Sequence, residues 1–293
     1  MLVKKMDSEI ARIIGLKGVM RFTVSLVFGT TICGYFEGQM ITILDGSKKL
    51  LPMSIVIDGE LKGRGYSIGD AISVSWNDDS DFVVTQDTVT SNLRIQASAE
   101  YYLISHMFTQ IRSALQTLGT ETKGMIPVIS TIGRFLPLIK YSGVEAKIYD
   151  LVAERTNLLT NDLIEGKEIT AENIVGYGIG LTPSADDFLL GISSIFDIFG
   201  EAIRREILAA YIEKHLHTTT EVSGWMLRYG IRNKLYPEII LEYLEHPYSG
   251  KLKADDFLKH GSTSGIDLLC GMLYGLDILM EKQGKTGDVK PTE

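Results

Sequence analysis

The sequence predicts an α+β protein, in which an N-terminal antiparallel β-barrel or sandwich domain is followed by a C-terminal helical domain. Of its 293 residues, 45% are hydrophobic and 23% are charged, as is typical of soluble globular proteins. Short runs rich in β-branched and aromatic residues fill residues 18–90, and from about residue 96 the apolar residues recur with helical spacing. We therefore expect a β domain at 1–95, a helical domain at 96–282 and a disordered tail at 283–293.

The expected strands follow one another without helical segments between them. Their sequences are VMRFTVSLVFGTTICGYFEGQMITILDG, SIVIDG, DAISVSW and DFVVTQDTV. Turn signals separate them at residues 45–46, 58–59, 63–65 and 77–79. Several short strands at this spacing are typical of an antiparallel barrel or sandwich.

The expected helices begin with one that Ser98 caps and that runs through Leu118. Its apolar face is formed by residues spaced three or four apart: Leu103, Met107, Ile111, Leu115 and Leu118. Two prolines divide residues 125–139 into two short pieces. Further helices are expected at 144–159, 201–216, 236–244 and 254–259.

Charge and composition argue against several classes of partner. The formal net charge of −8 argues against nucleic acid or an anionic membrane surface as the main partner. Two distant cysteines suggest a reducing compartment, and the N-terminus lacks the apolar core of a signal peptide. The longest apolar stretch, residues 188–199, is too short to span a bilayer. We expect a cytoplasmic protein.

Two segments of the helical half repeat one pattern, S-x-x-D-x-L-x-G-x5-D-I. The first is GYGIGLTPSADDFLLGISSIFDIF at 176–199, and the second is GSTSGIDLLCGMLYGLDIL at 261–279. When Asp187 is aligned with Asp267, six positions match without a gap at a constant offset of 80 residues. This match predicts a duplicated element in which a polar loop leads into a buried helix.

The repeated pattern favours a ligand site where the two helices begin. Ser184 and Ser264 are placed to cap their helices with an aspartate three residues later, and Thr182 is a second cap candidate in the first copy. Free N–H groups at a helix start attract anions, and glycine lets the backbone approach a ligand. The glycines that we assign to ligand binding are Gly178, Gly180 and Gly265. Gly191 and Gly271 would let the two helices approach each other closely.

A third polar helix start occurs in HTTTEVSGWML, where Thr218 and Glu221 have capping-box spacing. Together with Thr219 and Thr220, this start could converge with the other two on one cavity. Such a cavity would suit a small ligand that is multiply anionic or carries an amide.

The acidic residues of these starts leave three interpretations open. Asp186, Asp187 and Asp267 would repel an anion unless they cap their own helices. Otherwise they could accept hydrogen bonds from an amide, or hold a cation. The capping boxes also have a purely structural explanation, and Asp197 and Asp277 could be polar contacts between helices. The sequence has no H-E-x-x-H and no C-x-x-C motif, and no Ser-His-Asp order, so we assign no cofactor, no metal ligands and no nucleophilic triad, and the need for a metal stays open.

The segment GYGIGLTPSADDFLLG resembles the signature Gly-x-Gly-x-Gly-Leu-Thr-Pro-Ser-Gly-Asp-Asp-Phe-Leu of the AllH-type family, the small subunit of oxamate carbamoyltransferase. One departure is Ala185, where the family usually has glycine. TTTEVSGWML and GSTSGIDLLCGML fall where the family has its other polar motifs. The resemblance implies carbamoyl transfer between carbamoyl phosphate and oxamate in allantoin catabolism, together with two larger partner subunits.

The resemblance and the polar helix starts lead to one assignment of roles. Asp187 and Asp267 are the expected catalytic residues, which orient or deprotonate the attacking nitrogen. The expected substrate-binding residues are Gly178, Gly180, Thr182, Ser184, Asp186, Thr219, Thr220, Ser264 and Gly265. Two alternatives stay open: a non-catalytic assembly or regulatory subunit, and a sensor that binds a small anion without turnover.

Overall fold

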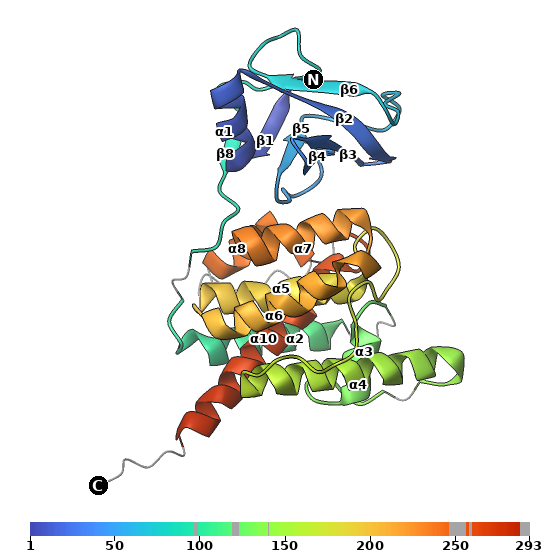
Figure 1. The fold of residues 1–293 in the computed structure, drawn as a ribbon, viewed down its shortest axis with the longest axis vertical. Coiled ribbons are helices and arrows are strands. Elements are labelled where there is room, and N and C mark those ends of the chain that lie inside the picture. Colours follow the sequence, from blue (N-terminus) through green and yellow to red (C-terminus); the bar gives the residue numbers. More distant parts are fainter. Residues whose placement is uncertain (97–98, 119–122, 140, 246–255, 258–259, 288–293) are drawn as a thin grey trace. The chain divides into compact units, whose positions relative to one another are not determined.

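The structure is a computed structural model that describes residues 1–96, 99–118, 123–139, 141–245, 256–257 and 260–287. The chain divides into two compact units (Figure 1). The first unit combines Met1–Arg94 with Leu235–Leu241, and the second combines Ile95–Lys234 with the chain from Glu242 onward. The predicted fold class, a β domain followed by helices, is confirmed.

The first unit is a curled eight-stranded sheet in the order β7-β6-β2-β3-β4-β5-β1-β8. Its strands are β1 (Val3–Asp7), β2 (Val19–Phe28), β3 (Thr31–Phe36), β4 (Gln39–Leu44), β5 (Ser54–Ile57), β6 (Ala71–Ser75), β7 (Phe82–Val83) and β8 (Val89–Ser91). Four strand pairs are antiparallel, whereas β1–β8, β4–β5 and β6–β7 are parallel. The Val83 N–H donates to the Met1 carbonyl at 2.6 Å, so the sheet curls until β7 meets the start of the chain.

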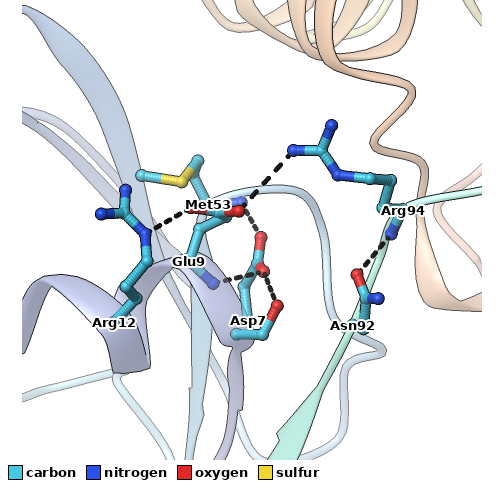
Figure 2. Close-up of polar contacts among 7 residues, drawn as sticks. Asp7, Glu9, Arg12, Met53, Asn92 and Arg94 are labelled. Atoms are coloured by element: carbon cyan, nitrogen blue, oxygen red, sulfur yellow. Dashed lines mark hydrogen bonds and ion pairs between the residues drawn. The ribbon is translucent and has the colours of Figure 1, made fainter. Parts of the chain in front are cut away.

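A buried aspartate joins β1 to helix α1 (Ser8–Lys17), as Figure 2 shows. The Asp7 carboxylate accepts the Glu9 N–H at 3.0 Å, as an N-cap, and the Met53 N–H at 2.8 Å. Burial raises the pKa of Asp7. Because Met53 has a positive φ of 54°, this bond also holds a turn that few side chains favour. Asp7 is therefore a structural residue of the β unit.

The segment Leu235–Leu241 belongs to the β unit through polar contacts. The Glu238 carboxylate accepts the Leu50 N–H at 3.0 Å and pairs with the Lys5 ammonium at 2.9 Å. The Tyr236 N–H donates to the Leu93 carbonyl at 2.9 Å. The boundary between the units is thus crossed more than once by the chain.

The helices after residue 95 are α2 (Leu103–Thr117), α3 (Ile126–Ile132), α4 (Gly143–Glu165), α5 (Ser184–Ile198), α6 (Ala202–His215), α7 (Glu221–Asn233), α8 (Glu238–Glu245) and α10 (Ser264–Gly287), with a 3-10 turn at Leu216–Thr218. Every residue of α5 is buried, and α5 packs against α6, α7 and α10 (Figure 1). This confirms the burial predicted for the first repeated helix. None of the helices in the described part is long and apolar enough to cross a membrane.

Several expected helix bounds change. Helix α2 begins at Leu103, and Ser98 lies outside the described residues. Only the first half of 125–139 is helical, because α3 ends at Gly133 in the left-handed region. Most of the helix expected at 254–259 lies outside the described residues. Helix α10 continues to Gly287, within the expected tail, and residues 288–293 lie outside the description.

The two repeated helices cross at their glycines. A Cβ atom on Gly191 would overlap the Leu268 carbonyl oxygen and lie 2.9 Å from the Met272 nitrogen. A Cβ atom on Gly271 would overlap the Phe188 carbonyl oxygen. The close approach that these glycines predicted is confirmed, and it brings the beginnings of α5 and α10 together.

Candidate functional site

The two serine-led turns meet in the helical unit. The hydroxyl oxygens of Thr182, just before α5, and Ser264, at the start of α10, lie 2.8 Å apart. The two turns are about eighty residues apart in the chain, so only the crossing of the helices brings them together. The convergence expected from the repeat is therefore present.

Ser184 does not cap its own helix. Helix α5 begins at Ser184 after Pro183, and no side chain caps it. Instead, the Ser184 hydroxyl donates to Asp267 on α10, and the Ser264 hydroxyl donates to Asp187 on α5. The capping box predicted at Ser184 is wrong, because a buried carboxylate on the neighbouring helix takes its hydroxyl. The result is a crossed pair of serine–aspartate bonds that relates the two copies of the repeat.

Asp187 is 7% exposed, and its carboxylate contacts the hydroxyls of Ser264 and Thr182, which are also hydrogen-bonded to each other. Burial raises its pKa well above the ordinary value, and repulsion from the nearby Asp267 carboxylate raises it further. The hydroxyl donors oppose this effect only in part. At neutral pH, an ionised Asp187 beside an ionised Asp267 is therefore strongly disfavoured unless a positive partner is present.

Asp267 is fully buried, and burial raises its pKa to about 6. Its Oδ1 accepts the Met125 N–H at 2.6 Å, and the hydroxyls of Ser184 and Thr263 also donate to this carboxylate. Gly124 has a φ of +64°, and a Cβ atom there would overlap Asp267 Oδ1. Sequence reasoning missed this contact between the Asp267 carboxylate and the turn before α3.

One oxygen of each aspartate has no hydrogen-bond partner among the described residues. These atoms are Oδ2 of Asp187 and Oδ2 of Asp267, and both are inaccessible to solvent. A buried acceptor without a partner costs about 1–3 kcal/mol, and more when it is charged. Two such atoms on neighbouring carboxylates mark a place built for a donor or a cation.

The neighbouring Asp186 has a different task. Its Oδ1 accepts the Gly176 N–H at 2.7 Å, while its Oδ2 accepts the hydroxyls of Thr219 and, at 2.6 Å, Ser223. Burial raises its pKa, and these three donors oppose the effect. Because Asp186 and Thr219 bind each other, we assign them to holding the glycine loop against α7.

Helix α7 is capped by Thr220, not by Thr218 as its spacing predicted. The Thr220 hydroxyl oxygen accepts the Ser223 N–H at 3.1 Å, and its hydroxyl donates to the Leu181 carbonyl. Thr218 instead lies in the preceding 3-10 turn and donates to the Val175 carbonyl at 2.9 Å. The third polar start nevertheless converges on the loop before α5.

The loop itself requires glycine at two positions. Gly176 and Gly178 have positive φ angles of 84° and 118°. A Cβ atom on Gly176 would overlap the Thr218 carbonyl oxygen, and one on Gly178 would lie 2.5 Å from the Ser184 nitrogen. Gly180, with φ of 108°, has open space around it, and its neighbour Ile179 is 94% exposed. The outer half of the loop therefore faces solvent.

Several N–H groups expected to bind an anion are used within the chain. Ala185 N–H donates to the Tyr177 carbonyl at 3.0 Å, and those of Asp186 and Asp187 donate to the Pro183 carbonyl. Gly265 N–H donates to the His260 carbonyl at 3.0 Å. A Cβ atom on Gly265 would overlap the Phe257 carbonyl oxygen, which gives this glycine a packing role. The buried centre of the site therefore offers acceptors rather than anion-binding donors.

The carboxylates later in the repeat are structural. Asp197 pairs with Arg205 at 2.6 Å and with Lys234 at 3.3 Å, and Asp277 pairs with Arg134 at 2.5 Å. The repeat therefore contains two kinds of buried aspartate. One kind is neutralised by a basic side chain, and the other, at Asp187 and Asp267, forms none of the ion pairs found among the described residues.

Comparison with known families identifies the segment that carries both unpaired aspartates. Residues 174–276 match the AllH family. The family is described as oxamate carbamoyltransferase subunit AllH, and the match confirms the resemblance found in the sequence. No solved structure matches the chain.

The AllH match includes all three polar helix starts and ends within α10. It leaves out the turn at Gly124 and Met125, although Met125 binds Asp267 directly. The described residues contain no cluster of three or more histidine, cysteine, aspartate or glutamate side chains that could hold a metal ion. Any cation at Asp187 and Asp267 would therefore need ligands besides these two carboxylates.

Proposed function

We propose that this chain is a subunit of a cytoplasmic carbamoyltransferase that transfers a carbamoyl group between carbamoyl phosphate and oxamate in allantoin catabolism. We further propose that Asp187 and Asp267 form the polar centre of its substrate site, and that the complex includes two larger partner subunits. The observation that carries this proposal is the pair of buried, unpartnered Oδ2 atoms within the AllH segment.

The chemistry of the two substrates suits acceptors of this kind. Oxamate and carbamoyl phosphate each carry an –NH₂ group with two N–H donors, which two carboxylate oxygens can accept. In the transfer, the oxamate nitrogen attacks the carbamoyl carbon, the bond from that carbon to the phosphate oxygen breaks, and the nitrogen loses a proton. A carboxylate whose pKa is about 6, such as Asp267, is mostly ionised at neutral pH and can accept that proton.

The surrounding residues then bind the substrate, shape the loop or position the aspartates. Thr182 and Ser264 contact the Asp187 carboxylate and each other, and Thr182 lies two residues after Gly180 of the exposed loop, so we retain both as substrate-binding residues. Gly178 and Gly180 shape that loop, whose outer part is exposed and accessible to a substrate carboxylate. Ser184, which binds Asp267, acts by positioning it.

The test combines binding and turnover. Asp187→Asn and Asp267→Asn are each expected to lower oxamate or carbamoyl phosphate affinity and to abolish most activity of the complex reconstituted with its partner subunits. Asp277→Asn, on the same helix α10 but paired with Arg134, is the matched control and should keep substrate affinity. Full affinity and activity in both site variants would contradict the proposal.

A second candidate, a non-catalytic assembly subunit, is favoured by one observation. Helix α4 exposes an apolar stripe on one face, at Val144, Ile148, Leu151 and Leu158, with 43–75% of each residue exposed. Exposed apolar patches often mark contact surfaces with other proteins. The assembly role would be supported if the complex stays active with both aspartate substitutions but loses activity when the exposed Leu151 and Leu158 of α4 become polar. Substrate binding without turnover in the full complex would favour a sensor.

A further inference from the structure

We infer that Asp187 and Asp267 together hold one divalent cation of the Mg²⁺ or Mn²⁺ type, bound by their unpartnered Oδ2 atoms. The inference about binding rests on the two buried, unpartnered oxygens and on the oxygen atoms beside them. Its consequence for catalysis rests in addition on the proposed carbamoyl transfer.

The first support is the unsatisfied state of the pair. Buried carboxylates in proteins are normally paired with a base or coordinate a metal. Asp187 is 7% exposed and Asp267 is fully buried, yet each has an Oδ2 without a hydrogen-bond partner in the described part of the chain. The later aspartates of the repeat, Asp197 and Asp277, are neutralised by arginine, and both oxygens of Asp186 accept hydrogen bonds. A basic partner is thus missing at the beginnings of α5 and α10, where Asp187 and Asp267 lie, and present further along both helices.

The second support is the kind of atoms that surround the pair. The Ser184 hydroxyl contacts the Asp267 carboxylate, and the mutually hydrogen-bonded hydroxyls of Thr182 and Ser264 contact the Asp187 carboxylate, so hydroxyl oxygens with lone pairs surround the pair. The side chains that contact the pair thus offer oxygen, the ligand that hard cations prefer. Two carboxylates carry the charge of one divalent ion. Mg²⁺ is commonly bound through one or two carboxylates, with waters and substrate phosphate as the remaining ligands.

The inference also resolves a conflict in the proposed function. Carbamoyl phosphate and oxamate are anions, and two buried carboxylates would repel them. A divalent cation between the carboxylates reverses the sign of the local charge and attracts a phosphate or carboxylate oxygen. The acidic pair and the anionic substrates are then compatible in one site.

The direct test is titration of the full chain with Mn²⁺ alone, after removal of metals with EDTA and near neutral pH. We expect one saturable site per chain by calorimetry, from which excess Mg²⁺ displaces Mn²⁺. Asp187→Asn and Asp267→Asn should each weaken binding at least about tenfold, because even outer-shell changes at metal sites cost about 10–100-fold. Asp277→Asn should leave the affinity unchanged.

Two outcomes would overturn the inference: no saturable Mn²⁺ binding by the folded wild-type chain, or undiminished binding in both variants. If the variants fail to fold, the wild-type protein still decides, because the thermal midpoint must rise with Mn²⁺ and fall with EDTA. If the chain binds oxamate or carbamoyl phosphate in EDTA and shows no Mn²⁺ site, the cation inference is refuted and the proposed function is retained. If the chain has a Mn²⁺ site but binds neither substrate, the cation inference is supported and the proposed function is contradicted.

Discussion

Replacing Asp267 with asparagine should change how stability depends on pH. In the folded protein the pKa of Asp267 is raised from 3.8 to about 6, so the folded state binds this proton more tightly than the unfolded chain. The stabilisation is complete at low pH and is lost as the pH rises through about 6. Since one pKa unit corresponds to about 1.36 kcal/mol, the loss is about 3 kcal/mol.

The asparagine side chain of the Asp267→Asn variant cannot titrate, so the variant should escape this loss while its side-chain oxygen still accepts the Met125 N–H. Urea unfolding in EDTA, at about pH 4 and about pH 8, measures the effect. The stability of the variant relative to wild type should rise by about 2.4 kcal/mol between the two conditions, because at about pH 4 the unfolded chain is already partly ionised. Asp150→Asn, at an exposed position on α4, is the control for general charge effects. The reasoning is refuted if Asp267→Asn and wild type change in parallel.

Three further substitutions test the packing and the polar contacts. Gly191→Ala should lower the unfolding free energy by about 1–3 kcal/mol in urea titrations, because the new methyl group overlaps the Leu268 carbonyl. Asp186→Ala removes a carboxylate that accepts three hydrogen bonds, so hydrogen exchange of the Gly176 amide should accelerate while α1 amides keep their protection. Arg205→Ala takes one of two bases from the buried Asp197 and should destabilise the fold by roughly 1–3 kcal/mol, measured as a lower urea midpoint; no change would show that Lys234 suffices.

The pairing of α5 with α10 could be predicted because the sequence contains the same information twice. Repetition of serine, aspartate and glycine at a constant offset pointed to equivalent positions on two helices, and small residues at Gly191 and Gly271 showed where they touch. By contrast, the Met125 N–H is a backbone donor, and no side-chain pattern identifies it. Such a contact depends on where the turn before α3 lies, which only the folded chain determines.

The errors at the helix starts have a common physical cause. Capping rules describe what a serine or threonine does when its own helix offers the best free partner. Here Ser184 and Ser264 find a buried carboxylate on the other helix, and Thr218 finds the Val175 carbonyl. Thr220 then caps α7 instead. Local spacing located the polar starts correctly but not the partner of each hydroxyl.

The β unit shows a similar limit. Strand-forming runs and turns were visible in residues 18–90, but the three parallel pairs depend on connections that the runs do not encode. Helix α1 was not predicted, although Asp7 stands at its N-cap. That carboxylate also binds the Met53 N–H, so its position reflects a tertiary contact as much as a local one.

Packing and chemistry in the helical unit depend on the same residues. The Asp267 carboxylate raises the pKa of Asp187, and the two residues are near each other where α5 and α10 cross almost in backbone contact at Gly191 and Gly271. A larger residue at either glycine would separate the carboxylates and relax their repulsion, even if the fold survived. The glycines are therefore expected to affect any ligand held between the aspartates, although neither glycine contributes a polar side chain.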